Sequence, residues 1–167
     1  ATCTRAINDL SASGLISQTA EGTNKWITTA YTKSELLEKA YGRLKTPVDR
    51  ILYVKGTAQI EHPIASGIRA LARQSMIGVN DQDGAIAISK KEAAKIPAED
   101  ICTKQYFEDF GGAVIEVWSY DPIILERDGC VDDISLLLSM DNDPNERVQT
   151  CLDEIRQKHG LPIKEEE

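Results

Sequence analysis

The chain has 167 residues and a formal net charge of −8, and 41% of its residues are hydrophobic. This length allows one domain or two small ones, and the negative balance argues against a protein that coats nucleic acid indiscriminately. No run of 18 apolar residues and no basic, apolar leader is present, so we expect no membrane span, no secretion and a cytoplasmic location. The four cysteines form no CxxC pair and only two histidines occur. This pattern predicts reduced thiols, no metal site and no cofactor, and leaves a disulfide open.

Charge is distributed unevenly along the chain. Residues 1–56 hold eight basic and five acidic residues, a net +3, whereas residues 57–167 carry a net −11. A mildly basic first third joined to an acidic remainder suits a nucleic-acid contact at one end. We therefore expect a first portion at residues 1–46 and a small acidic domain at residues 47–167.

The first thirty residues predict a helix, a glycine stop and a β-hairpin. Within residues 2–13, the apolar side chains that recur on one side of a helix are Ala6, Ile7 and Leu10. Gly14 follows as a natural helix terminator. Residues 17–31 then predict two short strands, joined by a polar turn at residues 21–24.

A second helix is predicted after the hairpin. Thr32 or Ser34 can cap its first turn, in which the acidic Glu35 favours the helix N-terminus. The helix is expected to run to about residue 45, before Pro47 ends it.

The acidic remainder predicts a small three-stranded α/β domain covered by helices. Its strands are expected at residues 51–54, 85–88 and 113–118. Its helices are expected at residues 64–76, 89–94, 121–125, 131–140 and 143–160. Because a three-stranded sheet needs both faces packed, we expect the last two helices to cover it, with a dimer interface as their alternative role. The predicted fold class for the whole chain is therefore α+β or α/β.

Residues 2–18, TCTRAINDLSASGLISQ, resemble the recognition helix and first wing strand of winged helix-turn-helix regulators of the MarR-like type. That family commonly shows T-x-x-R-x-[IV]-x-x-L-x-x-x-G-[LI]-[IV] at this point. Residues 31–41, YTKSELLEKAY, are similar to the segment that follows its wing. The resemblance implies a partial winged helix, consisting of a recognition helix plus β-wing. The two helices that precede the recognition helix in that family are expected upstream of Ala1; if Ala1 is instead a true start, the winged-helix interpretation fails.

This resemblance also implies roles for individual side chains. The residues expected to face the major groove or its phosphates are Thr2, Thr4, Arg5 and Asn8. Arg5 could make a bidentate contact to guanine, and Lys25 near the wing tip would touch backbone phosphate or the minor groove. A helical salt bridge to Asp9, four residues further on, is the competing interpretation of Arg5.

The acidic domain is similar, more faintly, to the C-terminal part of bacterial winged-helix proteins related to abortive-infection antitoxins. The residues that carry this similarity are AISKKE at 87–92, IEVWSYDP at 115–122 and the segment 131–155. In those proteins a regulator controls its own operon or a partner toxin. The function implied is non-catalytic, sequence-specific binding of double-stranded DNA by a bacterial transcriptional regulator. It could take the form of an antitoxin-like autorepressor, acting as a homodimer or with a partner toxin protein.

Two other interpretations of the chain stay open at this point. One is a protein-interaction module without DNA contact, for which Trp118 and Tyr120 could anchor a partner; the alternative for this pair is the core and rim of a strand. The other is a Mg²⁺-dependent nuclease that uses Asp83, Glu116 and Lys90 or Lys91. Such sites place a lysine two residues from an acid on one strand, and Trp118 occupies that position here.

Overall fold

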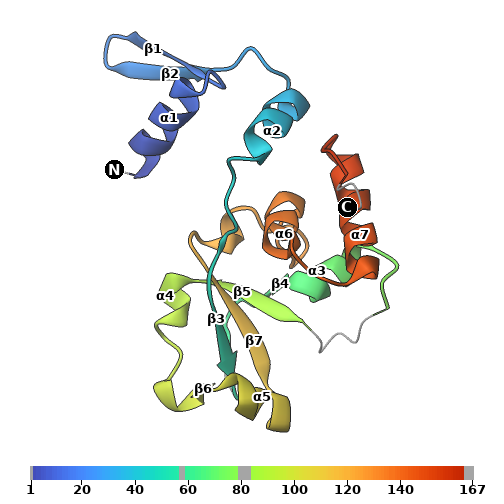
Figure 1. Cartoon of the computed structure of the whole chain (residues 1–167). Helices are drawn as coiled ribbons and strands as arrows, with labels where there is room; N and C mark the ends of the chain where they lie inside the picture. Colours follow the sequence, from blue (N-terminus) through green and yellow to red (C-terminus); the bar gives the residue numbers. More distant parts are fainter. Residues whose placement is uncertain (1, 57–58, 79–83, 164–167) are drawn as a thin grey trace. The chain divides into compact units, whose positions relative to one another are not determined.

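The computed structural model describes residues 2–56, 59–78 and 84–163, apart from the side chain of Thr2. The described part of the chain is a mixed α and β structure with two separate sheets. It divides into two compact units (Figure 1). We call residues 1–44 with 156–167 the hairpin unit, and residues 45–155 the sheet unit. No helix among the described residues is long and apolar enough to cross a membrane.

The hairpin unit contains the helix, glycine stop and hairpin predicted from the sequence. Its elements are α1 (Thr2–Ala12), β1 (Ser17–Glu21) and β2 (Asn24–Thr28), the two strands being antiparallel. Gly14 ends α1 with φ +71°, and Gly22 opens the two-residue turn with φ +63°. Left-handed backbone of this kind favours glycine, so both breaks are encoded locally.

Two hydrogen bonds join the hairpin to the end of α1. Gln18 Nε2 donates to Ser11 Oγ at 2.8 Å, and Thr29 Oγ1 donates to the Leu15 carbonyl at 2.8 Å. Leu15 is buried, whereas Ile7 and Leu10 on the apolar side of α1 are only half-buried. Helix and hairpin therefore form one supersecondary element.

The second helix, α2 (Lys33–Tyr41), begins as predicted but ends earlier. Thr32 is its N-cap and forms a capping box with Glu35. Hydrogen bonds that the Thr32 hydroxyl and backbone N–H donate to the Glu35 carboxylate lower the pKa of Glu35. The expected end near residue 45 is wrong, because Gly42 caps α2 and the next residues form i to i−3 turns. Because glycine has a low helix propensity, α2 ends at Gly42 and not at Pro47.

The sheet unit has five strands instead of the three predicted. In sheet order they are β4 (Ile64–Ser66), β5 (Ala85–Ser89), β7 (Ala113–Trp118), β3 (Val48–Val54) and β6 (Ile101–Cys102). The three predicted strands are the central ones, β5, β7 and β3. The pairing of β5 with β7 is parallel, and every other pairing is antiparallel. The missed strands are the two short edges, for which the sequence offers only weak patterns.

The helix predicted at residues 64–76 is wrong at its start. Ile64–Ser66 instead form β4, which pairs with β5, and α3 (Gly67–Gln74) follows. Gly67 has φ +54°, outside the right-handed helical region, so the backbone breaks between strand and helix. Ser66 is fully buried and belongs to the sheet.

The remaining helices are α4 (Lys90–Ala93), α5 (Lys104–Phe110), α6 (Asp133–Met140) and α7 (Glu146–Lys158), with short 3₁₀ turns η1 (Ala98–Asp100) and η2 (Pro122–Ile124). Of these helices, α4 packs on β5 and β7, α5 on β3, and α6 on α3. On one face of the sheet, Ala93 of α4 joins Val54, Ile88, Ile115 and Val117 in a buried apolar cluster. Within the sheet unit, α6 and α7 bury side chains that include Leu136, Leu137, Val148 and Leu152. These side chains are therefore part of the core, and whether the two helices also form a dimer interface stays a prediction.

The opposite face of β7 carries polar groups. Glu116 and Trp118 alternate with Ile115 and Val117 along the strand, so they point away from the apolar cluster. All four side chains are buried. On this second face, which we call the polar face, Ser66 of β4 bonds to Glu116, and Ser135 of α6 bonds to Tyr120, which follows β7.

Candidate nucleic-acid interface and a buried carboxylate

The side of α1 that faces solvent carries the predicted DNA-reading residues. Thr4, Arg5 and Asn8 are exposed, and their i+3 and i+4 spacing puts them on one side of the helix, opposite Ile7 and Leu10. Thr2 begins α1, and its side chain lies outside the described residues. These groups offer hydroxyl, amide and guanidinium donors side by side.

The competing interpretation of Arg5 is not realised. No ion pair joins Arg5 to Asp9 among the described residues, although both side chains are exposed. The guanidinium therefore faces solvent from the polar side of α1. A planar group with five N–H donors suits bidentate contact with a base edge or a phosphate.

Lys25 is the second residue of β2, close to the hairpin turn. It pairs with Ala20 of β1, and its side chain is exposed, as are all residues of both strands. Trp26 and Ile27, which follow it, are 56% and 51% exposed. The hairpin thus presents one cation and two large apolar side chains to its surroundings.

Trp118 and Tyr120 do not form an exposed anchor. Trp118 is 1% exposed, its Nε1 donates to Glu116 Oε2 at 3.0 Å, and its ring meets that of Tyr120 edge-on at 5.4 Å. The Tyr120 hydroxyl shares a 2.5 Å hydrogen bond with Ser135 of α6. Burial raises the pKa of the Tyr120 hydroxyl above its usual value, and the hydrogen bond with Ser135 opposes this effect. The partner-anchor interpretation of Trp118 is therefore corrected: an indole inside the unit cannot be an anchor on its surface.

The residues of the nuclease interpretation have separate partners. Lys90 Nζ binds Asp49 Oδ1 at 2.7 Å, whereas Glu116 accepts hydrogen bonds from Ser66 and Trp118. The Lys90 contact lowers the pKa of Asp49. Asp83 lies outside the described residues. Within residues 2–56, 59–78 and 84–163, no group of three His, Cys, Asp or Glu side chains is placed to hold a metal ion.

Glu116 is the feature whose environment the sequence did not indicate. The residue is 9% exposed, and its Oε2 accepts hydrogen bonds from both the Ser66 hydroxyl and the Trp118 indole N–H. A pocket of about 580 Å³ lies beside it in the sheet unit, between β7, the start of α3 and the end of α6. An acidic residue inside the apolar run AVIEVW was the available sequence signal, because buried charge in a strand requires partners.

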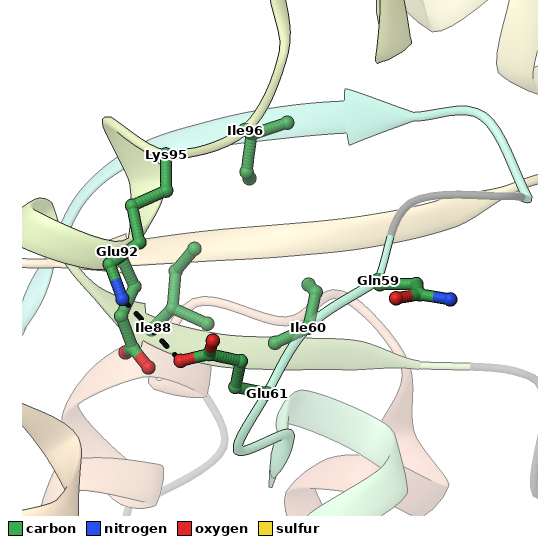
Figure 2. Close-up of a pocket in the computed structure, with 7 residues that line it drawn as sticks. All are labelled: Gln59, Ile60, Glu61, Ile88, Glu92, Lys95 and Ile96. Carbon is green, nitrogen blue, oxygen red and sulfur yellow. Dashed lines mark hydrogen bonds and ion pairs between the residues drawn. The ribbon is translucent and has the colours of Figure 1, made fainter.

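A smaller pocket of about 250 Å³ lies on the apolar face (Figure 2). Ile60, Ile88 and Ile96 line it, together with charged side chains. Figure 2 shows the ion pair between Lys95 Nζ and Glu61 Oε2, at 3.4 Å, across the lining. The third charged group, Glu92, belongs to the capping box of α4. The charges of this pocket are thus engaged by the chain itself.

Comparison of the chain with protein-family models, curated proteins and solved structures finds no match. The function therefore has to be argued from the geometry of the two units.

Proposed function

We propose that the chain is a sequence-specific DNA-binding transcriptional regulator. In this proposal α1 is the recognition helix and the β1–β2 hairpin is the wing of a partial winged helix. The protein would act without catalysis, as an antitoxin-like autorepressor or a related regulator. A homodimer, or a partner toxin protein, would supply the second half-site.

One observation carries the proposal: α1 presents Thr4, Arg5 and Asn8 together on its solvent side, directly before a two-stranded hairpin that carries Lys25. Helices that enter the major groove use such short polar side chains and arginine on one side. The bonds from Gln18 and Thr29 hold the hairpin against the helix end, so both elements could engage one duplex. The net +3 of residues 1–56 suits this end of the chain as the contact.

A protein-interaction module is the second candidate, and exposed Trp26 and Ile27 favour it. Large apolar side chains on a small surface are typical of protein contacts. The two candidates differ in salt dependence. Each phosphate contact contributes about −0.9 to the slope of log affinity against log salt, whereas apolar association is much less sensitive.

The test is selection of bound sequences from randomised duplexes by the full chain, followed by fluorescence anisotropy on the selected site. We expect Arg5→Ala to weaken specific binding by about 1–3 kcal/mol and to relax the preference at one base pair. Arg5→Lys keeps the charge but loses the bidentate geometry, so it should retain non-specific binding. Lys25→Ala should weaken binding to all DNA sequences alike, and should reduce the slope of log affinity against log salt by about 1.

Arg43→Ala is the matched control, since Arg43 is an exposed cation of the same unit beyond α2. It removes the same charge as Arg5→Ala and should leave base preference unchanged. The proposal would be refuted if the selection enriched no DNA sequence and the affinity did not change with salt concentration. This result would favour the interaction module.

A further inference from the structure

We propose that the pocket beside Glu116 binds a small organic cation, an alkyl chain that ends in a guanidinium or ammonium group. This inference concerns the sheet unit alone and does not depend on DNA binding by the hairpin unit. It rests on the burial of Glu116, the composition of the pocket lining and the backbone around it.

Glu116 has one carboxylate oxygen satisfied and one directed at the pocket. Oε2 accepts from Ser66 Oγ and from Trp118 Nε1, whereas Oε1 takes no hydrogen bond from the described residues. The residue as a whole is 9% exposed. Oε1 is not one of the fully buried, unpartnered atoms of the described residues, so water in the pocket can reach it. A ligand N–H in place of that water would form a charge-assisted hydrogen bond with the carboxylate.

The charge of the lining has a single sign. The acidic residues of the lining are Glu116, Asp141 and Asp143, of which Asp141 already takes part in another interaction. No lysine, arginine or histidine is among the described lining residues. In the smaller pocket of Figure 2, by contrast, Lys95 offsets Glu61. Among its described lining residues, the Glu116 pocket therefore has no cation of the kind that Lys95 supplies in the other pocket.

The rest of the lining favours an organic cation over a metal ion. Ile68, Leu138 and Met140 supply apolar surface next to the carboxylate. Metal ions such as Mg²⁺ or Ca²⁺ need several oxygen ligands around one point, and no such group of three acidic, His or Cys side chains occurs in the described chain. A pocket of about 580 Å³ is within the usual size of small-molecule sites.

The backbone keeps the pocket open next to Glu116 and holds its far wall in place. Gly67 has φ +54°, and a Cβ there would stand 3.7 Å from Oε1, in the space a ligand donor needs. The wall that follows α6 is fixed to α7, because Gln149 Nε2 donates to the Asp143 carbonyl at 2.8 Å. The Asn145 N–H also donates to Asp143 Oδ1, at 2.9 Å. The site is thus largely formed before a ligand arrives.

The test is titration of the ¹⁵N-labelled full chain with n-butylguanidinium, n-butylammonium and n-butylurea, followed by two-dimensional NMR. Butylurea has nearly the shape of butylguanidinium but carries no charge. We expect saturable shifts at Gly67, Gly84 and Asn142 with one or both cations and none with butylurea. Glu116→Gln keeps an acceptor for Ser66 and Trp118, and should weaken cation binding at least about tenfold.

Glu108→Gln is the charge-matched control, because Glu108 is exposed on α5 and pairs only with Lys104 among the described ion pairs. It should leave the affinity unchanged. If Glu116→Gln does not fold, Asn142→Lys decides: Asn142 is exposed at the rim, and a cation there should also weaken binding at least about tenfold. Absence of saturable cation binding by the wild type overturns the inference. So does an affinity that neither variant changes, or equal binding of butylurea.

Discussion

Replacement of Ser66 by alanine should destabilise the sheet unit through Glu116. Ser66 Oγ donates to Glu116 Oε2, and both residues are buried on the polar face. Ser66 also occupies the N-cap position of α3, yet its side chain makes no capping hydrogen bond. The whole effect of Ser66→Ala should therefore come from the contact with the carboxylate.

A hydrogen bond to a charged group contributes about 1.5–3 kcal/mol, so we expect Ser66→Ala to lower the free energy of unfolding by about 2 kcal/mol. With a urea m-value of roughly 1.5–2 kcal/mol per molar, the midpoint should fall by about 1 M. In a Glu116→Gln background the same change removes a neutral hydrogen bond, whose contribution is about 1 kcal/mol. The double-mutant cycle should therefore show a coupling of about 1 kcal/mol.

The assay is urea unfolding followed by tryptophan fluorescence in a Trp26→Phe background. Trp118 is then the single indole of the chain, and it contacts Glu116 directly, so the signal reports on the sheet unit. Ser119→Ala, an exposed change next to the same strand, is the control and should stay within about 0.5 kcal/mol. A loss below that value for Ser66→Ala, or an equal loss with and without the Glu116 charge, would refute the reasoning.

Two further predictions concern backbone geometry and ionisation in the sheet unit. A Cβ at Gly112 would stand 2.1 Å from the Val54 carbonyl oxygen, whereas one at Gly111 meets nothing within 4 Å. In urea unfolding, Gly112→Ala should therefore cost about 3 kcal/mol or more. Gly111→Ala should cost less, about 1–3 kcal/mol, because its φ of 76° and ψ of −174° lie in a region that essentially only glycine adopts; equal costs would contradict this. In a pH titration followed by absorbance at 295 nm, one tyrosine should ionise above pH 10.0, because the pKa of Tyr120 is raised. This late step should be missing in Tyr120→Phe. Ser135→Ala should raise the pKa of Tyr120 further, because it removes the hydrogen bond that lowers it. The Tyr120 hydroxyl binds its proton more tightly in the folded state than in the unfolded chain. The stability that this contributes is therefore present below the pKa of the unfolded state and is lost as pH rises through the pKa of the folded state. Titration of every tyrosine at the usual pH would contradict this.

Local signals predicted the hairpin unit well. The stop at Gly14, the turn at residues 21–24 and the cap at Thr32 each follow from the chemistry of one or two neighbouring residues. The three central strands of the sheet were found for the same reason, since continuous apolar runs are typical of buried strands. The DNA-contact residues stay a prediction.

Edge strands and buried polar groups were not predictable in this way. Residues 64–66 have no strand pattern of their own, and only pairing with β5 makes them β4. From the sequence, Trp118 could be either a surface anchor or a core residue, because it is large and apolar. Its hydrogen bond to the buried Glu116 places it in the core. Single residues of this kind take their role from neighbours distant in the chain.

The sequence by itself determined the order of most elements, the uneven charge and the polar side of α1, because these depend on spacing within a few residues. Only the tertiary structure decided the sheet order, the short edges and the environment of Glu116. Ser66 and Glu116 lie 50 residues apart in the chain and meet only when β4, β5 and β7 pair. Contacts at such separation leave no periodic trace in the sequence, and the pocket beside Glu116 is built from several of them.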